Sequence, residues 1–157
     1  MSRAFTREED NEAIADIGER PVSPHRNLVT ERGLAMIEAE LEALRKELAK
    51  AERQEDRERI AAASRDLRYW TARRENAELS VPEPDSPVVR FGMGVTLEGE
   101  DGGKVHWKIV GEDEADPGKG SISHVSPMAQ ALFGKAVGDI VTVNGREWEV
   151  AALDARP

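Results

Sequence analysis

The hydrophobic pattern of residues 34–77 predicts two helices, each with one narrow apolar seam. In both halves of this segment the seam positions recur at alternating spacings of three and four, which is typical of a coiled coil. Neither seam is wide enough to form a globular core, so each helix needs a partner. The first seam consists of Leu34, Ile37, Leu41, Leu44, Leu48 and Ala51, and the second of Ile60, Ala63, Leu67, Trp70, Arg74 and Ala77, with Arg74 as its only charged member.

The simplest partner for each helix is the other helix. The apolar rhythm lapses between Glu52 and Glu58, and we expect the chain to turn there into an antiparallel hairpin. The alternative is a single long helix that dimerises with a second chain, because heptads without internal caps allow both arrangements. Thr30 offers an N-cap oxygen for the first helix, and Glu31 lies in the first turn, where negative charge is favourable.

Beyond residue 80 the hydrophobic period becomes that of strands. Three prolines within residues 81–87 end the second helix and predict a linker. Asn144-Gly145 between two apolar runs suits a type I′ hairpin turn. Ser126 can cap a short helix that starts at Pro127 and ends before Gly134. Strands are expected at Val88–Phe91, Val95–Leu97, Val105–Ile109, Ile140–Val143 and Arg146–Val150.

These elements together predict an α+β protein. An N-terminal antiparallel coiled-coil hairpin is followed by a small antiparallel β-sheet with one short helix. The expected domain limits are an extended tail over residues 1–27, the hairpin over 28–80, a proline-rich linker over 81–87 and the second domain over 88–157.

Charge and cysteine content narrow the classes of function. The 157-residue chain has no cysteine and a net charge of −9, which excludes disulfides and thiolate sites and fits a reducing compartment. No apolar run approaches the roughly 20 residues of a membrane span, so a cytoplasmic protein without a membrane partner is expected. Residues 80–157 carry 7 basic and 13 acidic side chains, which argues against a direct grip on nucleic acid.

The hairpin holds half of the basic residues. Pairing with glutamates across the hairpin is one interpretation of the arginines on the second helix, and a role near phosphate is the other. These arginines are Arg57, Arg59, Arg65, Arg68, Arg73 and Arg74, and the facing glutamates are Glu38, Glu40, Glu42 and Glu47.

No catalytic constellation is present in the sequence. His25, His106 and His124 lack the spacing of metal ligands. Ser126 has no histidine in a recognisable motif, so helix capping is its expected role. The acidic run of residues 110–117 lacks the ligand periodicity of a calcium loop. The sequence therefore predicts a non-enzymatic protein with no cofactor and no metal site.

Several motifs resemble the Gre transcript-cleavage factors of bacterial RNA polymerase, over residues 28–153. The segments similar to the C-terminal domain of that family are Val89–Gly92, Ile109–Asp116, Ile122–Lys135 and Gly138-Asp139. Those similar to its N-terminal coiled coil are Thr30–Leu34, Glu40–Leu44 and Arg65–Asn76.

The resemblance implies a C-terminal domain of FKBP-like fold that docks on the rim of the polymerase's secondary channel, with the coiled coil pointing inward. In that family an acidic loop and a Ser-Pro turn lie on the docking side. An ordinary capped helix with one core methionine is the simpler interpretation of Pro127 and Met128, and it is compatible with docking. The residues carried over to polymerase binding are Asp113, Glu114, Asp116, Ser126, Pro127 and Met128.

The hairpin tip departs from the family pattern. Cleaving members have a Gly-Asp-x-x-Glu-Asn turn whose carboxylates help to hold a second Mg²⁺, and this chain has no such turn. The first helix, from Thr30 to Arg53, spans only about 36 Å, less than the family's usual hairpin. The candidate tip carboxylates are Glu55, Asp56 and Glu58, and Arg53, Arg57 and Arg59 are expected to compete for them.

The leading hypothesis is a monomeric regulator that binds RNA polymerase at the secondary channel and modulates elongation or initiation without cleaving RNA. Contact with nucleic acid would then be indirect, through the complex. A cleavage stimulator is the first alternative. A prolyl isomerase, suggested only by the implied fold, needs an aromatic-lined pocket. A generic coiled-coil adaptor would not need the acidic loop and the Ser-Pro turn.

Overall fold

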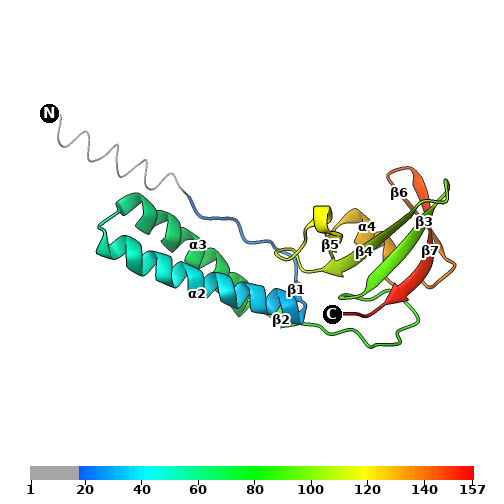
Figure 1. Cartoon of the computed structure of the whole chain (residues 1–157), viewed down its shortest axis with the longest axis horizontal. Coiled ribbons are helices and arrows are strands. Elements are labelled where there is room, and N and C mark those ends of the chain that lie inside the picture. Colours follow the sequence, from blue (N-terminus) through cyan, green and yellow to red (C-terminus); the bar gives the residue numbers. More distant parts are fainter. Residues whose placement is uncertain (1–17) are drawn as a thin grey trace. The chain divides into compact units, whose positions relative to one another are not determined.

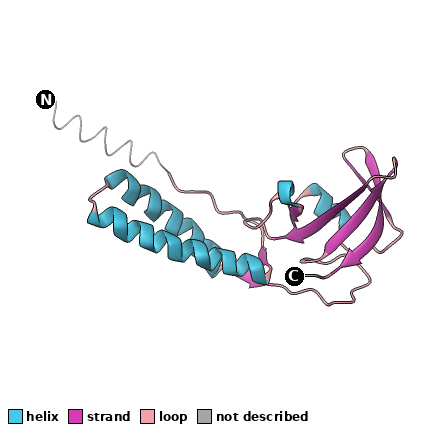
Figure 2. Cartoon of the chain, viewed as in Figure 1, coloured by secondary structure: helices cyan, strands magenta, loops and turns pink. Residues whose placement is uncertain are grey.

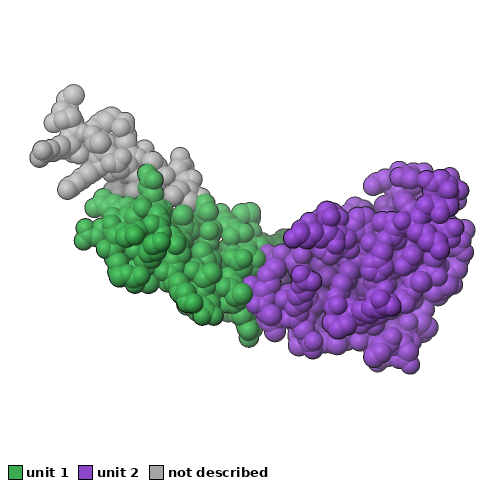
Figure 3. Space-filling view, viewed as in Figure 1, with its two compact units in different colours: residues 1–24, 37–76 green, residues 25–36, 77–157 purple. Residues whose placement is uncertain are grey.

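The computed structural model describes residues 18–157, so the tail predicted over residues 1–27 lies mostly outside the described part. The described chain forms two compact units (Figure 3). Residues 18–24 and 37–76 belong to the first, and residues 25–36 and 77–157 to the second. The short segments before and after the hairpin thus pack with the C-terminal residues, and the predicted domain limits stay a prediction.

The first unit contains the helical hairpin (Figure 1). Helix α2 spans Glu31–Arg53 and α3 spans Arg57–Glu75. The turn between them includes Glu55, which has a positive φ of 54°. Asp56 caps α3, because its carboxylate accepts a hydrogen bond of 3.2 Å from the Arg59 amide. The predicted antiparallel hairpin and the position of its turn are confirmed.

The apolar seam is buried where the two helices face each other. Ile37 and Ala51 of α2 and Ala63 of α3 are at most 3% exposed. Among residues 18–157, the buried arginine is Arg73, at 0% exposure, and not Arg74 as the heptads predict. Arg74 is exposed and donates to Glu38 at 3.1 Å. With about 100° of rotation per residue, the side chains of Ala63 and Arg73 point in directions about 80° apart around the axis of α3. The buried face near the end of α3 is therefore not the face that carries the coiled-coil seam.

Two of the predicted ion pairs across the hairpin are confirmed. Arg59 donates to Glu47 from α3 to α2, with an Nε–Oε1 distance of 2.9 Å, and Arg74 pairs with Glu38. Arg65 instead bonds Asp66 on its own helix, at 3.1 Å. The arginines of α3 therefore pair both with a carboxylate of their own helix and with carboxylates across the hairpin.

The second unit begins with a small parallel sheet that the sequence did not predict. Strand β1 (Asn27–Val29) pairs with β2 (Ala77–Leu79), with Asn27 opposite Ala77. The pairing extends by one bond of 3.0 Å, from the Ser80 amide to the Val29 carbonyl. Residues before α2 and after α3 are thereby joined.

The main sheet has five strands in the order β5-β4-β3-β7-β6 (Figure 2). Its pairs are antiparallel except β4–β5, which is parallel. The prediction of a wholly antiparallel sheet is wrong for this pair, because the chain returns through a 3-10 turn before β5 begins. The strands are β3 (Gly94–Gly99), β4 (Lys104–Val110), β5 (Ser121–Ser123), β6 (Ile140–Val143) and β7 (Arg146–Asp154), and the 3-10 turn is η1 (Pro117–Lys119).

Residues 88–91 do not form the predicted strand. The Val89 amide donates to the Lys135 carbonyl at 2.8 Å, and the Gly134 amide donates to the Val89 carbonyl at 3.0 Å. The segment is therefore satisfied by the loop after helix α4 (Pro127–Leu132) and adds no strand to the sheet. The predicted turn at Asn144-Gly145 is confirmed, since both residues have positive φ.

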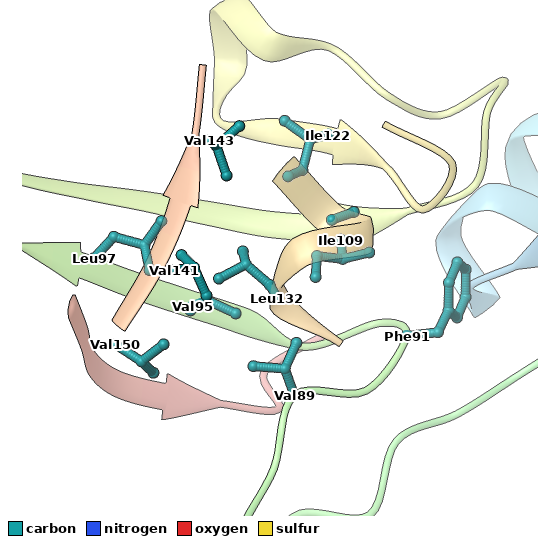
Figure 4. Packing of buried hydrophobic residues seen from close by; sticks show 11 residues of the cluster. Val89, Phe91, Val95, Leu97, Ile109, Ile122, Leu132, Val141, Val143 and Val150 are labelled. Carbon is teal, nitrogen blue, oxygen red and sulfur yellow. The ribbon is translucent and has the colours of Figure 1, made fainter. Parts of the chain in front are cut away.

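The core of the second unit lies between the sheet and α4. Leu132 of α4 points into the apolar face of the sheet, toward Val95 and Val141 (Figure 4). Phe91, from the irregular segment, belongs to the same buried cluster. Among residues 18–157, no helix is both long enough and apolar enough to cross a membrane.

Candidate docking site

The parallel pairing of β4 and β5 places the two predicted docking motifs at one end of the sheet. Val110 of β4 pairs with Ser123 of β5, and the His124 amide donates to the Val110 carbonyl at 2.9 Å. Both strands therefore end at the same level. The acidic loop that follows β4 and the Ser-Pro turn that follows β5 start side by side.

The acidic loop is a tight turn followed by a return toward the start of β5. The Ala115 amide donates to the Gly111 carbonyl at 3.1 Å, and Asp113 lies within this turn, half-buried. Asp116 is exposed, and its amide donates to Ser121 Oγ at 2.9 Å. Asp116 is thus held at the first residue of β5, whereas the Ser-Pro turn follows the last. Because β5 is three residues long, the two points are separated by about 7 Å along the strand.

Glu114 is tied to the N-terminus of α2. Thr30 Oγ1 accepts from the Gly33 amide at 2.9 Å and donates to Glu114 Oε1. Thr30 is thus confirmed as the cap of α2, and a carboxylate near a helix N-terminus is favourable. A Cβ at Gly33 would lie 2.6 Å from Glu114 Oε1, so the glycine leaves room for the contact. Glu114 therefore serves the fold of the second unit as well as its acidic surface.

The Ser-Pro turn caps a short helix, as the simpler interpretation of these residues predicts. Ser126 Oγ accepts from the Ala129 amide at 3.3 Å. Pro127 is the first helical residue and is exposed, whereas Met128 is half-buried and packs against the core. Pro127 is therefore the member of this motif that is most open to a partner, on a rigid helix start.

Sequence reasoning missed two residues that shape this end of the sheet. A Cβ at Gly111 would lie 2.5 Å from the Leu28 carbonyl oxygen, so only glycine lets β1 approach the acidic loop. His124 is buried and its ring meets Phe91 edge-on, with centroids 5.5 Å apart. A glycine directly after a strand was a signal for Gly111, whereas the burial of His124 had no signal in the sequence.

The hairpin tip differs in its side chains from the end of the sheet that carries the acidic loop and the Ser-Pro turn. Glu55 and Glu58 are exposed, and Asp56 caps α3. The Arg59 guanidinium contacts Glu47 and, at 2.5 Å, Gln54 Oε1. The expectation that Arg59 competes for tip carboxylates is therefore wrong, because its side chain lies across to α2. In the described part of the chain, no three His, Asp or Glu side chains gather as a metal site.

The described chain combines a helical hairpin with a small mixed sheet, in which an acidic loop starts beside a capped Ser-Pro turn. The family model described as "Transcription elongation factor, GreA/GreB, C-term" matches residues 83–153. Transcription elongation factor GreA of Thioalkalivibrio sulfidiphilus is 31% identical over 158 residues, which cover 80% of this chain and 95% of that protein. The chain belongs to the GreA/GreB family of transcription elongation factors.

The chain is also similar to a second curated relative and to a solved structure. GreA of Alkalilimnicola ehrlichii is 50% identical over 70 residues, which cover 41% of this chain and 44% of that protein. The chain thus spans less than half the length of this relative. The crystal structure of GreA factor homolog 1 (Gfh1) of Thermus thermophilus is 24% identical, with a TM-score of 0.40, over 82% of this chain and 99% of that one.

Proposed function

We propose that this protein binds RNA polymerase in the cytoplasm, at the rim of the secondary channel, and modulates elongation or initiation without stimulating RNA cleavage. The observation that carries the proposal is the family match over residues 83–153, a segment that includes every residue assigned to docking. The geometry adds support, because β4 and β5 deliver the acidic loop and the Ser-Pro turn to one end of the sheet.

The docking end combines negative charge with a rigid apolar contact. Asp113 and Asp116 contribute charge that would steer a basic partner surface and fix its orientation. Pro127 lies at the start of α4 with its ring exposed, so it can enter an apolar pocket at little cost in conformational entropy. We therefore expect affinity to depend on Asp116 and Pro127 together.

The double substitution Asp116→Ala and Pro127→Ala should weaken binding to core RNA polymerase by about 10- to 100-fold, as loss of interface anchors does. The control pairs Glu100→Ala with Pro87→Ala, an exposed acid and an exposed proline outside both motifs. Fluorescence anisotropy of labelled protein titrated with polymerase measures the affinity, and thermal melting confirms that both variants fold. Equal affinities of the two variants would refute the docking assignment.

The tip supports the non-cleaving part of the proposal. Mg²⁺ needs oxygen ligands at about 2.0–2.1 Å in nearly octahedral geometry. The Asp56 carboxylate is already held by the Arg59 amide, and Glu55 sits on a left-handed residue in the turn. We infer from these two features that the tip is poorly suited to hold Mg²⁺ for cleavage, and the 23 residues of α2 span only about 35 Å.

A cleavage factor is the second candidate, because Glu55 and Glu58 are exposed at the tip. In that case the tip carboxylates would be needed for activity on a backtracked complex. Loss of stimulated cleavage on substitution of Glu55 would favour this candidate over the non-cleaving regulator.

We also propose that the protein acts as a monomer, because Ile37, Leu41 and Ala51 are buried within a single chain. The seam then offers a second copy only the partly exposed edges of its other positions, such as Leu44, Leu48 and Ile60. Analytical ultracentrifugation at micromolar concentration should give the mass of one chain, about 17.3 kDa. A stable species of twice that mass would contradict the closed hairpin.

A further inference from the structure

Residues 18–24, here named the strap, run beside α3 and contact one turn of it (Figure 1). The guanidinium carbon of Arg20 lies 3.9 Å from the ring centroid of Tyr69 and 5.7 Å from that of Trp70. Its Nη1 lies 3.4 Å from Asp66 Oδ1. Arg20 is therefore held over an aromatic pair with a carboxylate beside it, a favourable arrangement for a cation.

A second strap residue grips the same turn of α3. Glu19 Oε1 accepts from Arg68 Nε at 2.7 Å and lies 2.6 Å from its Nη2. This hydrogen bond lowers the pKa of Glu19 and raises the pKa of Arg68. The negative Glu19 thus binds the positive Arg68, and the positive Arg20 next to it binds the Tyr69 ring and the Asp66 carboxylate.

The strap is attached by contacts that can open without unfolding the hairpin. Glu19, Arg68 and Arg20 are all substantially exposed, and cation–π contacts and ion pairs of exposed groups are individually weak. The most buried positions of the seam, such as Ile37 and Ala63, are not among these residues. Pro21 and Pro24 keep the strap extended and out of helix.

We infer that the strap is an autoinhibitory segment: it covers an interaction surface formed by Arg68, Tyr69 and Trp70 on α3, and polymerase must displace it to hold the hairpin. This inference rests on the proposed function, and on the coiled coil pointing into the channel as the family resemblance implies. A polymerase surface that contacts this turn of α3 competes directly with Glu19 and Arg20. Apparent affinity then falls in proportion to the fraction of molecules whose strap is open.

The binding test changes the strap alone. The double variant Glu19→Gln, Arg20→Gln removes both charges and leaves α3 intact. If the strap is open in about a tenth of the molecules, this variant binds core RNA polymerase about tenfold more tightly. The matched control is Arg26→Gln, which removes a neighbouring arginine that pairs with Glu78 in the second unit and should bind like the parent.

A second measurement reports the strap without polymerase. The chain has no cysteine, so Val22→Cys and Thr71→Cys, both at exposed positions, can carry two spin labels. Double electron–electron resonance should give a narrow distance distribution in the parent and a broad one in the Glu19→Gln, Arg20→Gln background. A broad distribution in the parent would show that the strap is not held against α3, and would refute the inference.

The outcomes separate this inference from the proposed function. If the strap is released and affinity is unchanged or weaker, autoinhibition is wrong while polymerase binding stands. If neither the parent nor the released variant binds polymerase, the proposed function fails and the inference fails with it. Tighter binding by the released variant, with parent-like binding by Arg26→Gln, supports the inference.

Discussion

Substitution of Gly111 by alanine should lower the free energy of unfolding of the second unit by about 3 kcal/mol, in the range of severe overpacking. The added Cβ would lie 2.5 Å from the Leu28 carbonyl oxygen, and a backbone atom cannot swing aside as a side chain can. This clash is removed only if β1 moves away from the acidic loop. The same movement would displace Thr30, which follows β1 and donates a hydrogen bond to Glu114.

Gly118→Ala is the matched control for this experiment. It adds the same methyl group in the same loop, but its Cβ would meet only Asp116 Oδ1, at 3.4 Å. Its free energy of unfolding should stay within about 0.5 kcal/mol of the parent. Urea denaturation followed by tryptophan fluorescence measures both variants. Equal stability of the two would show that β1 does not pack tightly against the acidic loop.

Replacement of Ile37 by aspartate should unfold the helical hairpin. Ile37 is 1% exposed in the seam, and an unpaired carboxylate there costs about 4 kcal/mol or more. Far-ultraviolet circular dichroism should lose much of its helical signal. The core of the main sheet uses Val95, Leu97 and Val150, so near-ultraviolet signals from that sheet should persist.

Ala39→Asp is the control for the hairpin, because Ala39 is exposed on the same helix. It introduces the same charge two residues away and should change stability by no more than about 0.5 kcal/mol. Helix loss of equal size in both variants would mean that the seam is not the buried face. Retention of full helicity in Ile37→Asp would contradict the closed hairpin.

The features that could be predicted from the sequence have local causes. The seam of Ile37, Leu41 and Ala51 follows from heptad spacing alone, and the turn at Asn144-Gly145 follows from the backbone that those residues favour. The Ser126 cap needs only a serine before a proline at the first position of a helix. The motifs of the acidic loop and the Ser-Pro turn then indicated the family.

The features that could not be predicted depend on contacts between distant segments. Pairing of Asn27 with Ala77 joins residues that flank the whole hairpin, and no local pattern encodes it. The same is true of the contact between Thr30 and Glu114. The extended segment around Val89 has a strand pattern, but its hydrogen bonds go to the loop after α4. Periodicity indicates which side is buried and not which partner covers it.

We propose that the protein occupies the polymerase without stimulating cleavage, and single-turnover cleavage of a backtracked transcript tests this proposal most directly. The complex is stalled, supplied with Mg²⁺ and followed for release of the 3′ RNA fragment, with this protein alone and with excess protein added to a cleaving GreA. We predict no acceleration by the protein alone and inhibition of GreA, lost in the Asp116→Ala, Pro127→Ala variant. Acceleration that disappears in Glu55→Ala or Asp56→Ala would contradict the account.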